Sequence, residues 1–246
     1  MHCLHALLLL PIALASLPAR GDDVPEDHAM HTHMQTDEAI NSWVGLNQLE
    51  TRRVDAETSI AWEVRGWIGT DLTRLWLRSD GERIHGRTAN ADVQLLLGRS
   101  ISPWWDMVAG IRHDSAPGKA QTFGAIGIQG LAPMRVDVAM TAYVSSNGHI
   151  NARLEFEHDL PFTQRLFLQS RLEMNLYGDS DVARQRASGL SAAMAGLRLR
   201  YEVTRQFAPY LGLQGEQAFG KTATLWRSAA RDPAQLQLVA GVRAWL

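Results

Sequence analysis

Apolar and polar residues alternate along much of this chain, and the alternation restricts the folds that it can adopt. Residues 164–178 read QRLFLQSRLEMNLYG, with mostly apolar residues at even positions and mostly polar residues at odd positions. Successive side chains of an extended strand point to opposite faces. The stretch therefore predicts a strand with one apolar and one charged face. Its apolar positions are Leu166, Leu168, Leu172, Met174 and Leu176, opposed by Arg165, Gln169, Arg171, Glu173 and Asn175.

The same pattern recurs in residues 134–144, 150–159 and 197–202. About twelve such segments follow one another from residue 43 to the C-terminus. An even number of half-apolar strands is what a closed antiparallel barrel of the bacterial outer membrane requires. We therefore predict an all-β fold, an antiparallel transmembrane β-barrel of about 12 strands. The predicted strands lie near residues 43–52, 57–68, 71–79, 91–99, 104–113, 121–130, 134–145, 149–158, 164–176, 190–202, 208–217 and 235–246.

The connections between these segments alternate in length. Short turns on one side and longer loops on the other are typical of an outer-membrane barrel, whose short turns face the periplasm. Both chain termini then fall on the periplasmic side. The links near 80–90, 115–120, 177–189 and 218–234 are longer and polar, and those near 100–103, 131–133, 159–163 and 203–207 are short, several with proline (Pro103, Pro133, Pro161).

A soluble β-sandwich is the competing architecture, because it also consists of short strands separated by turns. Two features favour the barrel. Charged residues lie consistently on one face of several strands, and aromatic residues lie near strand ends, where a membrane protein places its aromatic girdle. The expected girdle residues are Trp43, Trp67, Trp104, Trp105, Tyr177, Tyr210 and Trp245.

The charged face is expected to point into the barrel. Acidic and basic residues are mixed on it, so neighbouring strands can pair them. Twelve strands make a narrow barrel, and large paired side chains would close much of the lumen. The expected lumen residues are Glu63, Arg65, Arg74, Arg78, Asp92, Asp106, Arg112, Asp137, Arg153, Glu155, Glu157, Arg165, Arg171, Glu173, Arg198, Arg200, Glu202, Glu216 and Arg243.

The N-terminus predicts export. Residues 1–19 read MHCLHALLLLPIALASLPA, with an apolar run and small residues suited to cleavage after Ala15 or Ala19. The flanking histidines stand where a leader more often has lysine or arginine, so a buried apolar helix is the alternative. The run is too short to cross a bilayer as a helix.

The charge balance restricts the classes of partner, and the cysteine content restricts the disulfide bonds that the chain can form. The chain has 24 basic and 26 acidic residues, a balance that argues against a nucleic-acid partner. Its single cysteine, Cys3, lies in the predicted leader, so the exported chain would have no disulfide framework.

Residues 20–42 predict a disordered periplasmic tail with a concentration of soft metal donors. His28, Met30, His31, His33 and Met34 lie among carboxylates, with almost nothing that a core could bury. Thioether sulfur selects Cu(I), and imidazole binds copper as well as zinc or nickel. The five residues are therefore the predicted metal ligands, and a copper ion is the predicted cargo. The alternative is a solvated tail whose histidines bind nothing.

Two further sites were weighed. Met194 shares its face with Arg198 and Arg200, so its thioether is a candidate lumen ligand. A hydrolase would need a nucleophile and a base, and Ser145 with His149 would be the pair. They flank Asn147-Gly148, which indicates a hairpin turn, and we expect no enzyme.

The sequence from about residue 43 to the end resembles the copper resistance protein B family of bacterial outer-membrane proteins. The resemblance implies an outer-membrane β-barrel for copper tolerance, whose His/Met-rich N-terminal segment handles copper ions in the periplasm. It also implies a periplasmic partner, such as a multicopper oxidase or a copper carrier. The stretches that carry the resemblance are EVRGWIGTDLTRLWLRSDGE (63–82), GRSISPWWDMVAGIRHD (98–114), AIGIQGLAP (125–133), FTQRLFLQSRLEMNLYG (162–178), GLSAAMAGLRLRYEVTRQFAPYLGL (189–213) and QLVAGVRAWL (237–246).

The sequence thus predicts a signal peptide over 1–19, a disordered His/Met-rich periplasmic tail over 20–42 and an outer-membrane barrel over 43–246. The expected function is copper binding that contributes to copper resistance, by sequestering or exporting periplasmic copper. A generic solute or structural barrel with an incidental tail is the other hypothesis. The sequence leaves open whether copper crosses the lumen.

Overall fold

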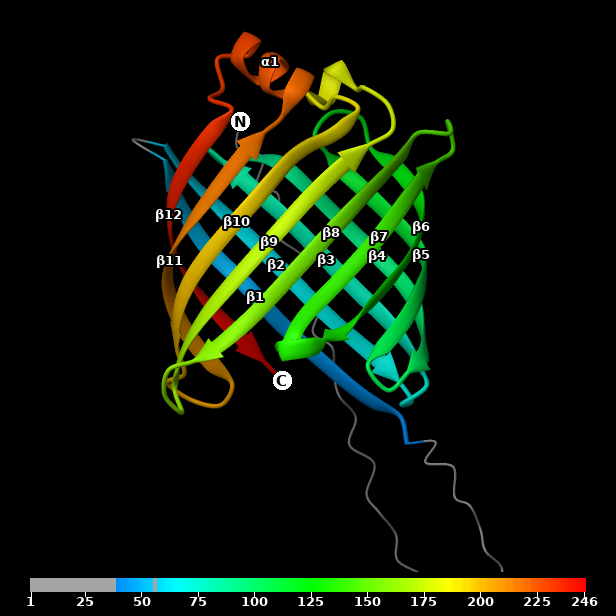
Figure 1. Cartoon of the computed structure of the whole chain (residues 1–246), viewed down its shortest axis with the longest axis vertical. Helices are drawn as coiled ribbons and strands as arrows, with labels where there is room; N and C mark the ends of the chain where they lie inside the picture. The colour runs from blue at the N-terminus through cyan, green and yellow to red at the C-terminus, as the bar shows by residue number, and fades with distance from the viewer. Residues whose placement is uncertain (1–38, 55–56) are drawn as a thin grey trace, which may run out of the picture. The chain divides into compact units, whose positions relative to one another are not determined.

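The computed structural model describes residues 39–54 and 57–246, and these form a closed antiparallel barrel (Figure 1). Each strand pairs with its neighbours in the sequence, and the last pairs with the first. The prediction of a twelve-stranded barrel is confirmed, and a two-sheet sandwich is excluded. The strands are β1 (Asn41–Val54), β2 (Glu57–Gly69), β3 (Thr73–Ile84), β4 (Arg87–Ser102), β5 (Trp105–Ala116), β6 (Gln121–Ala132), β7 (Val136–Ser145), β8 (Ile150–Pro161), β9 (Leu166–Tyr177), β10 (Gly189–Tyr201), β11 (Phe207–Ala218) and β12 (Ala234–Trp245).

The two rims of the barrel differ. One rim, here called the turn end, has short connections together with the start of β1 and the end of β12, at the bottom of Figure 1. The opposite rim, the loop end, has the segment 178–188 with the 3-10 helix η2 (Val182–Arg184), and the segment 219–233 with the helix α1 (Gly220–Ser228). The sequence had predicted only a polar loop where α1 lies. No helix in the described part of the chain is long and apolar enough to cross a membrane.

The connection between β3 and β4 is much shorter than the predicted loop over 80–90. The two strands continue to Ile84 and from Arg87, and they are joined by His85 and Gly86. These two residues have φ of 50° and 75°. Positive φ at both central residues is the mark of a type I′ turn, which matches the twist of a hairpin. Asp80-Gly81, which resembles a turn in the sequence, lies within β3.

The strands divide their side chains as the alternation predicts. Along β4 the exposed Leu95 and Leu97 face the lipid side, and Asp92, Gln94 and Leu96 are buried inside. A run of exposed apolar residues also follows the outer faces of β10 and β11. The outer surface is thus apolar, as a bilayer requires, and the lumen is largely polar.

Part of the lumen is nevertheless filled by apolar side chains. They come from the inner faces of β4 to β7 and pack against Trp76 of β3. This apolar lumen cluster occupies one wall of the barrel and excludes water there. Its members are Leu96, Val108, Phe123, Ala125 and Tyr143.

The expected aromatic girdle is wrong for at least four residues: Trp43 and Tyr177 line cavities of the lumen, and Tyr210 and Trp67 pack inside it. Tyr210 is only 5% exposed, and its hydroxyl donates to Glu50 at 3.0 Å. The ring of Trp67 lies 6.2 Å from that of Trp76 and 4.9 Å from the guanidinium of Arg74. Both rings therefore contribute to lumen packing, because a strand end fixes the height of a side chain but its parity fixes the face.

Candidate functional site

The five predicted copper ligands, His28, Met30, His31, His33 and Met34, lie outside the described residues. Within residues 39–54 and 57–246, no group of three or more His, Cys, Asp or Glu side chains is placed to hold a metal ion. Among the described residues, the candidate site is the lumen, where charged side chains gather.

Charged side chains meet across the lumen, which confirms that the charged face points inward, except that the expected lumen residue Arg165 lies exposed in the turn between β8 and β9. Arg65 of β2 contacts Glu155 of β8 at 3.0 Å, and Arg153 of β8 lies 3.6 Å from both Asp80 and Asp92. These partners come from opposite walls of the barrel. The pairs are largely buried, and each charge is matched because an unpaired charge in such a place costs several kcal/mol.

A central cluster lies at the middle of this network. Arg171 of β9 pairs with Glu63 of β2, and contacts Glu155 at 3.2 Å and Glu173 at 3.5 Å. Arg65 in turn contacts Glu63 at 2.7 Å. Three carboxylates and two guanidinium groups thus form a continuous bridge from one wall to the other.

A second buried cluster lies behind the seam where β12 meets β1. Arg198 donates to both carboxylate oxygens of Glu50 at 3.0 Å and to the amide oxygen of Gln214 at 2.7 Å. Arg52 contacts the same carboxylate at 2.7 Å. The cluster links β1, β10 and β11 through side chains alone.

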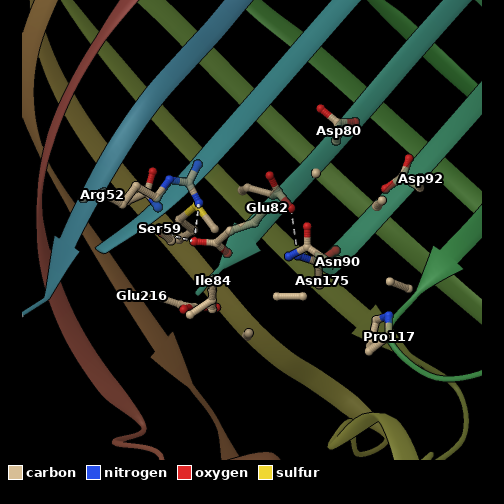
Figure 2. A pocket seen from close by; sticks show the side chains of 18 of the residues that line it. Arg52, Ser59, Asp80, Glu82, Ile84, Asn90, Asp92, Pro117, Asn175 and Glu216 are labelled. Carbon is tan, nitrogen blue, oxygen red and sulfur yellow. Dashed lines mark hydrogen bonds and ion pairs between the residues drawn. The ribbon is translucent and has the colours of Figure 1, made fainter. Parts of the chain in front are cut away.

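A cavity of about 440 Å³ opens within the loop-end half of the lumen (Figure 2). Ser59 donates to Glu82 at 2.6 Å on its wall, and Arg52 lies 3.9 Å from the same carboxylate. Acidic and basic side chains are mixed on this wall, so it carries no strong net charge. Met194, the candidate lumen ligand, lines the cavity.

The loop segments at this rim are fixed by specific contacts. The indole of Trp226 in α1 donates to the carbonyl of Gln185 at 3.2 Å, and the guanidinium of Arg231 lies 3.6 Å from the centre of the indole ring. Thr222 is 1% exposed and its hydroxyl accepts from the backbone N–H of Ala187 at 3.0 Å. Helix α1 and the segment 178–188 therefore pack as one unit.

A second cavity, of about 870 Å³, lies in the turn-end half. Its wall combines Trp43, Trp76 and Trp104 with charged residues, among them the Arg74 and Asp106 pair at 3.5 Å. The central cluster lies between the two cavities, since two of its members, Glu63 and Arg171, line both.

Sequence reasoning missed several inward charges. Glu50 and Arg52 were missed because β1 has a bulge between Leu46 and Gln48, which exchanges the faces of the residues after it. Asp80 and Glu82 were missed because they were assigned to a loop. The signal that could have identified these residues is the spacing of the charges, because Glu50 and Arg52, like Asp80 and Glu82, are two positions apart and so share a face.

Ser145 and His149, the pair weighed for hydrolysis, flank the expected turn. The N–H of Ser145 donates to the carbonyl of His149 at 2.9 Å, and that of Gly148 donates to the carbonyl of Ser145 at 3.0 Å. The hydroxyl of Ser145 accepts from the N–H of His149 at 3.2 Å. The hairpin turn is confirmed.

A closed barrel with an apolar exterior and a charged, paired interior defines an outer-membrane β-barrel protein. Among solved structures, a NanC porin is similar, with a TM-score of 0.54 and 9% identity over 84% of this chain and 99% of that one. At this identity the likeness concerns the fold alone.

The chain belongs to the copper resistance protein B family, because the family described as "Copper resistance protein B precursor (CopB)" matches residues 40–246. A copper resistance protein B homolog of Pseudomonas syringae pv. tomato is 46% identical over 213 residues, which cover 87% of this chain and 72% of the relative. Copper resistance protein B of Escherichia coli is 43% identical over 220 residues, 89% of this chain and 73% of the relative. The predicted family resemblance is confirmed.

Proposed function

We propose that this protein binds copper through its N-terminal segment and contributes to copper resistance by sequestering or exporting periplasmic copper. The observation that carries the proposal is the combination of family membership with the five imidazole and thioether donors at His28, Met30, His31, His33 and Met34. These donor types suit copper in both of its common oxidation states. The family name supports a task in copper resistance, and the donors supply a means.

The difference between the two rims supports an orientation in the membrane. Outer-membrane barrels have short turns on the periplasmic side and longer loops outside, and the two long segments, 178–188 and 219–233, lie at the rim opposite to Asn41 and Trp245. The N-terminal segment and the C-terminus would then be periplasmic. A segment there would meet periplasmic copper directly, beside a multicopper oxidase or copper carrier that could receive the ion.

The proposed function is non-enzymatic. Family membership and a porin-like fold support a binding or transport protein. A generic solute barrel is the second candidate, supported by the two lumen cavities.

A copper titration of the detergent-folded protein tests the proposal, with Cu(I) and Cu(II) added separately. A variant with alanine at the five tail positions should lose tight copper binding. The matched control replaces three histidines and two methionines of the barrel and should bind as the wild type does. The control positions are His85, His113, His149, Met107 and Met134.

Cells provide the second arm of the test. Deletion of residues 26–36 should lower copper tolerance while the barrel still assembles in the outer membrane. Unchanged copper binding and unchanged tolerance in both tail variants would contradict the proposal and favour the generic barrel.

A further inference from the structure

The two cavities of the lumen meet at one ion pair. Glu63 of β2 and Arg171 of β9 line both of them, and no other described residue lines both. β2 and β9 belong to opposite walls of the closed barrel. The ion pair between these two residues is therefore a septum across the lumen.

The rest of the cross-section is filled more permanently. The apolar lumen cluster packs against Trp76 on the wall formed by β3 to β7. Arg78, which is 2% exposed, donates to Gln129 across the same region. Close-packed apolar side chains do not part without a cost in buried area, whereas a side chain in a charge network can exchange one partner for another.

Arg171 has a second carboxylate partner, which it contacts at the same time as Glu63 and which it could keep on leaving Glu63. Glu173 lies two residues further along β9 on the same face, and its carboxylate is 3.5 Å from the guanidinium of Arg171. Glu173 lines the loop-end cavity and is absent from the wall of the turn-end cavity. A rotation of Arg171 toward Glu173 would move the guanidinium out of the septum and into the loop-end half.

The carboxylates left behind would keep partners. Arg65 contacts Glu63 at 2.7 Å and Glu155 at 3.0 Å, and the side-chain amide of Asn47 donates to Glu63 at 3.1 Å. Breaking a buried ion pair is strongly unfavourable mainly because it leaves a charge without compensation. Here both positions of Arg171 leave every carboxylate of the central cluster compensated, so the two states can be close in free energy.

We infer that Arg171 is a gate, which closes the lumen by pairing with Glu63 and opens a passage between the two cavities by turning to Glu173. The gate divides the barrel into two chambers and makes it a closed passage at rest. Small ions would cross when Arg171 has left Glu63 and keeps Glu173 as its partner. This inference concerns the lumen and does not depend on copper binding by the N-terminal segment.

Single-channel recording in planar lipid bilayers with potassium chloride tests the gate. The wild-type barrel should be mostly closed, with brief openings. Arg171→Gln removes the cation of the ion pair on β9, and Glu63→Gln removes its anion on β2. Both variants should show a several-fold higher open probability, and agreement between them is expected only if the pair is the barrier.

Two further variants complete the design. Glu173→Gln removes the alternative partner and should make openings rarer than in the wild type. Arg200→Gln is the control, because Arg200 pairs with Asp159 at 2.8 Å and lines neither cavity. This substitution also removes one lumen arginine, and the open probability of the variant should equal that of the wild type.

Folding of each variant is checked by its heat-dependent mobility on a gel before recording. If Arg171→Gln and Glu63→Gln both give recordings like those of the wild type, the ion pair does not block the lumen and the inference is wrong. Increased opening in those two with an unchanged Glu173→Gln would overturn the switch to Glu173. Increased opening in Arg200→Gln would show a general response to lost charge and would also overturn the inference.

Discussion

Arg198 of β10 donates two hydrogen bonds of 3.0 Å to the carboxylate of Glu50 on β1, although β11 and β12 lie between these strands in the sheet. Both residues are 1% exposed. The pair connects the first strand to the third from last across the seam where the barrel closes. Together with the hydrogen bond from Tyr210 of β11 to Glu50, it therefore reinforces the backbone hydrogen bonds that close the barrel between β1 and β12.

Removal of one partner of this pair should destabilise the barrel. Arg198→Met leaves the Glu50 carboxylate without its bidentate partner, and loss of one member of a buried ion pair costs about 3–5 kcal/mol. Arg52, at 2.7 Å, retains part of the compensation, so the lower end is expected. Urea unfolding of the barrel in lipid vesicles gives the change. The double variant with Glu50→Gln should recover part of the loss, and a double variant as unstable as Arg198→Met would contradict the interpretation.

Gly241 should tolerate no side chain. It lies on β12 at the seam, and a Cβ there would be 2.7 Å from the Tyr210 hydroxyl and 2.6 Å from the carbonyl oxygen of Leu49. Gly241→Ala is thus expected to displace Tyr210 and lower the free energy of unfolding by about 1–3 kcal/mol, as overpacking does. Gly215→Ala on the adjacent β11 is the control, because its nearest contact would be 3.9 Å. Equal stability of the two variants would show that the seam has room.

The His85-Gly86 turn should depend on its glycine. Gly86 has φ of 75°, and a residue with a side chain held in that region costs about 1–3 kcal/mol. Gly86→Val should therefore lower barrel stability in the same urea assay. His85→Asn should leave it unchanged or slightly higher, since asparagine followed by glycine favours a type I′ turn. A destabilising His85→Asn would mean that the imidazole has a role beyond the turn.

Alternation predicted the strands, and the charged face, the aromatic residues near strand ends and the alternating loop lengths then favoured a barrel over a sandwich. Parity also placed Arg65, Glu155 and Arg171 in the lumen. It could not identify which charges meet, since partners such as Glu63 and Arg171 are 108 residues apart and depend on the register of the whole barrel. The bulge in β1 reversed the parity that would have revealed Glu50. The predicted copper ligands lie outside the described residues and stay a prediction.

The packing of helix α1 against the segment 178–188 at the loop end should loosen when Trp226 is shortened. Its ring packs in a small apolar cluster with Ala218 and Ala223, and its N–H bonds to the carbonyl of Gln185. Trp226→Ala removes these contacts while leaving the barrel strands intact, so the segment 178–188 should become accessible to trypsin at its arginines. Cleavage of the folded protein, followed by mass spectrometry, measures the rate. Lys221→Ala, an exposed change in the same helix, is the control. A cleavage rate in Trp226→Ala no faster than in this control would show that the segment is held by its own contacts to the barrel, such as the 3.6 Å approach of Arg184 to Asp114.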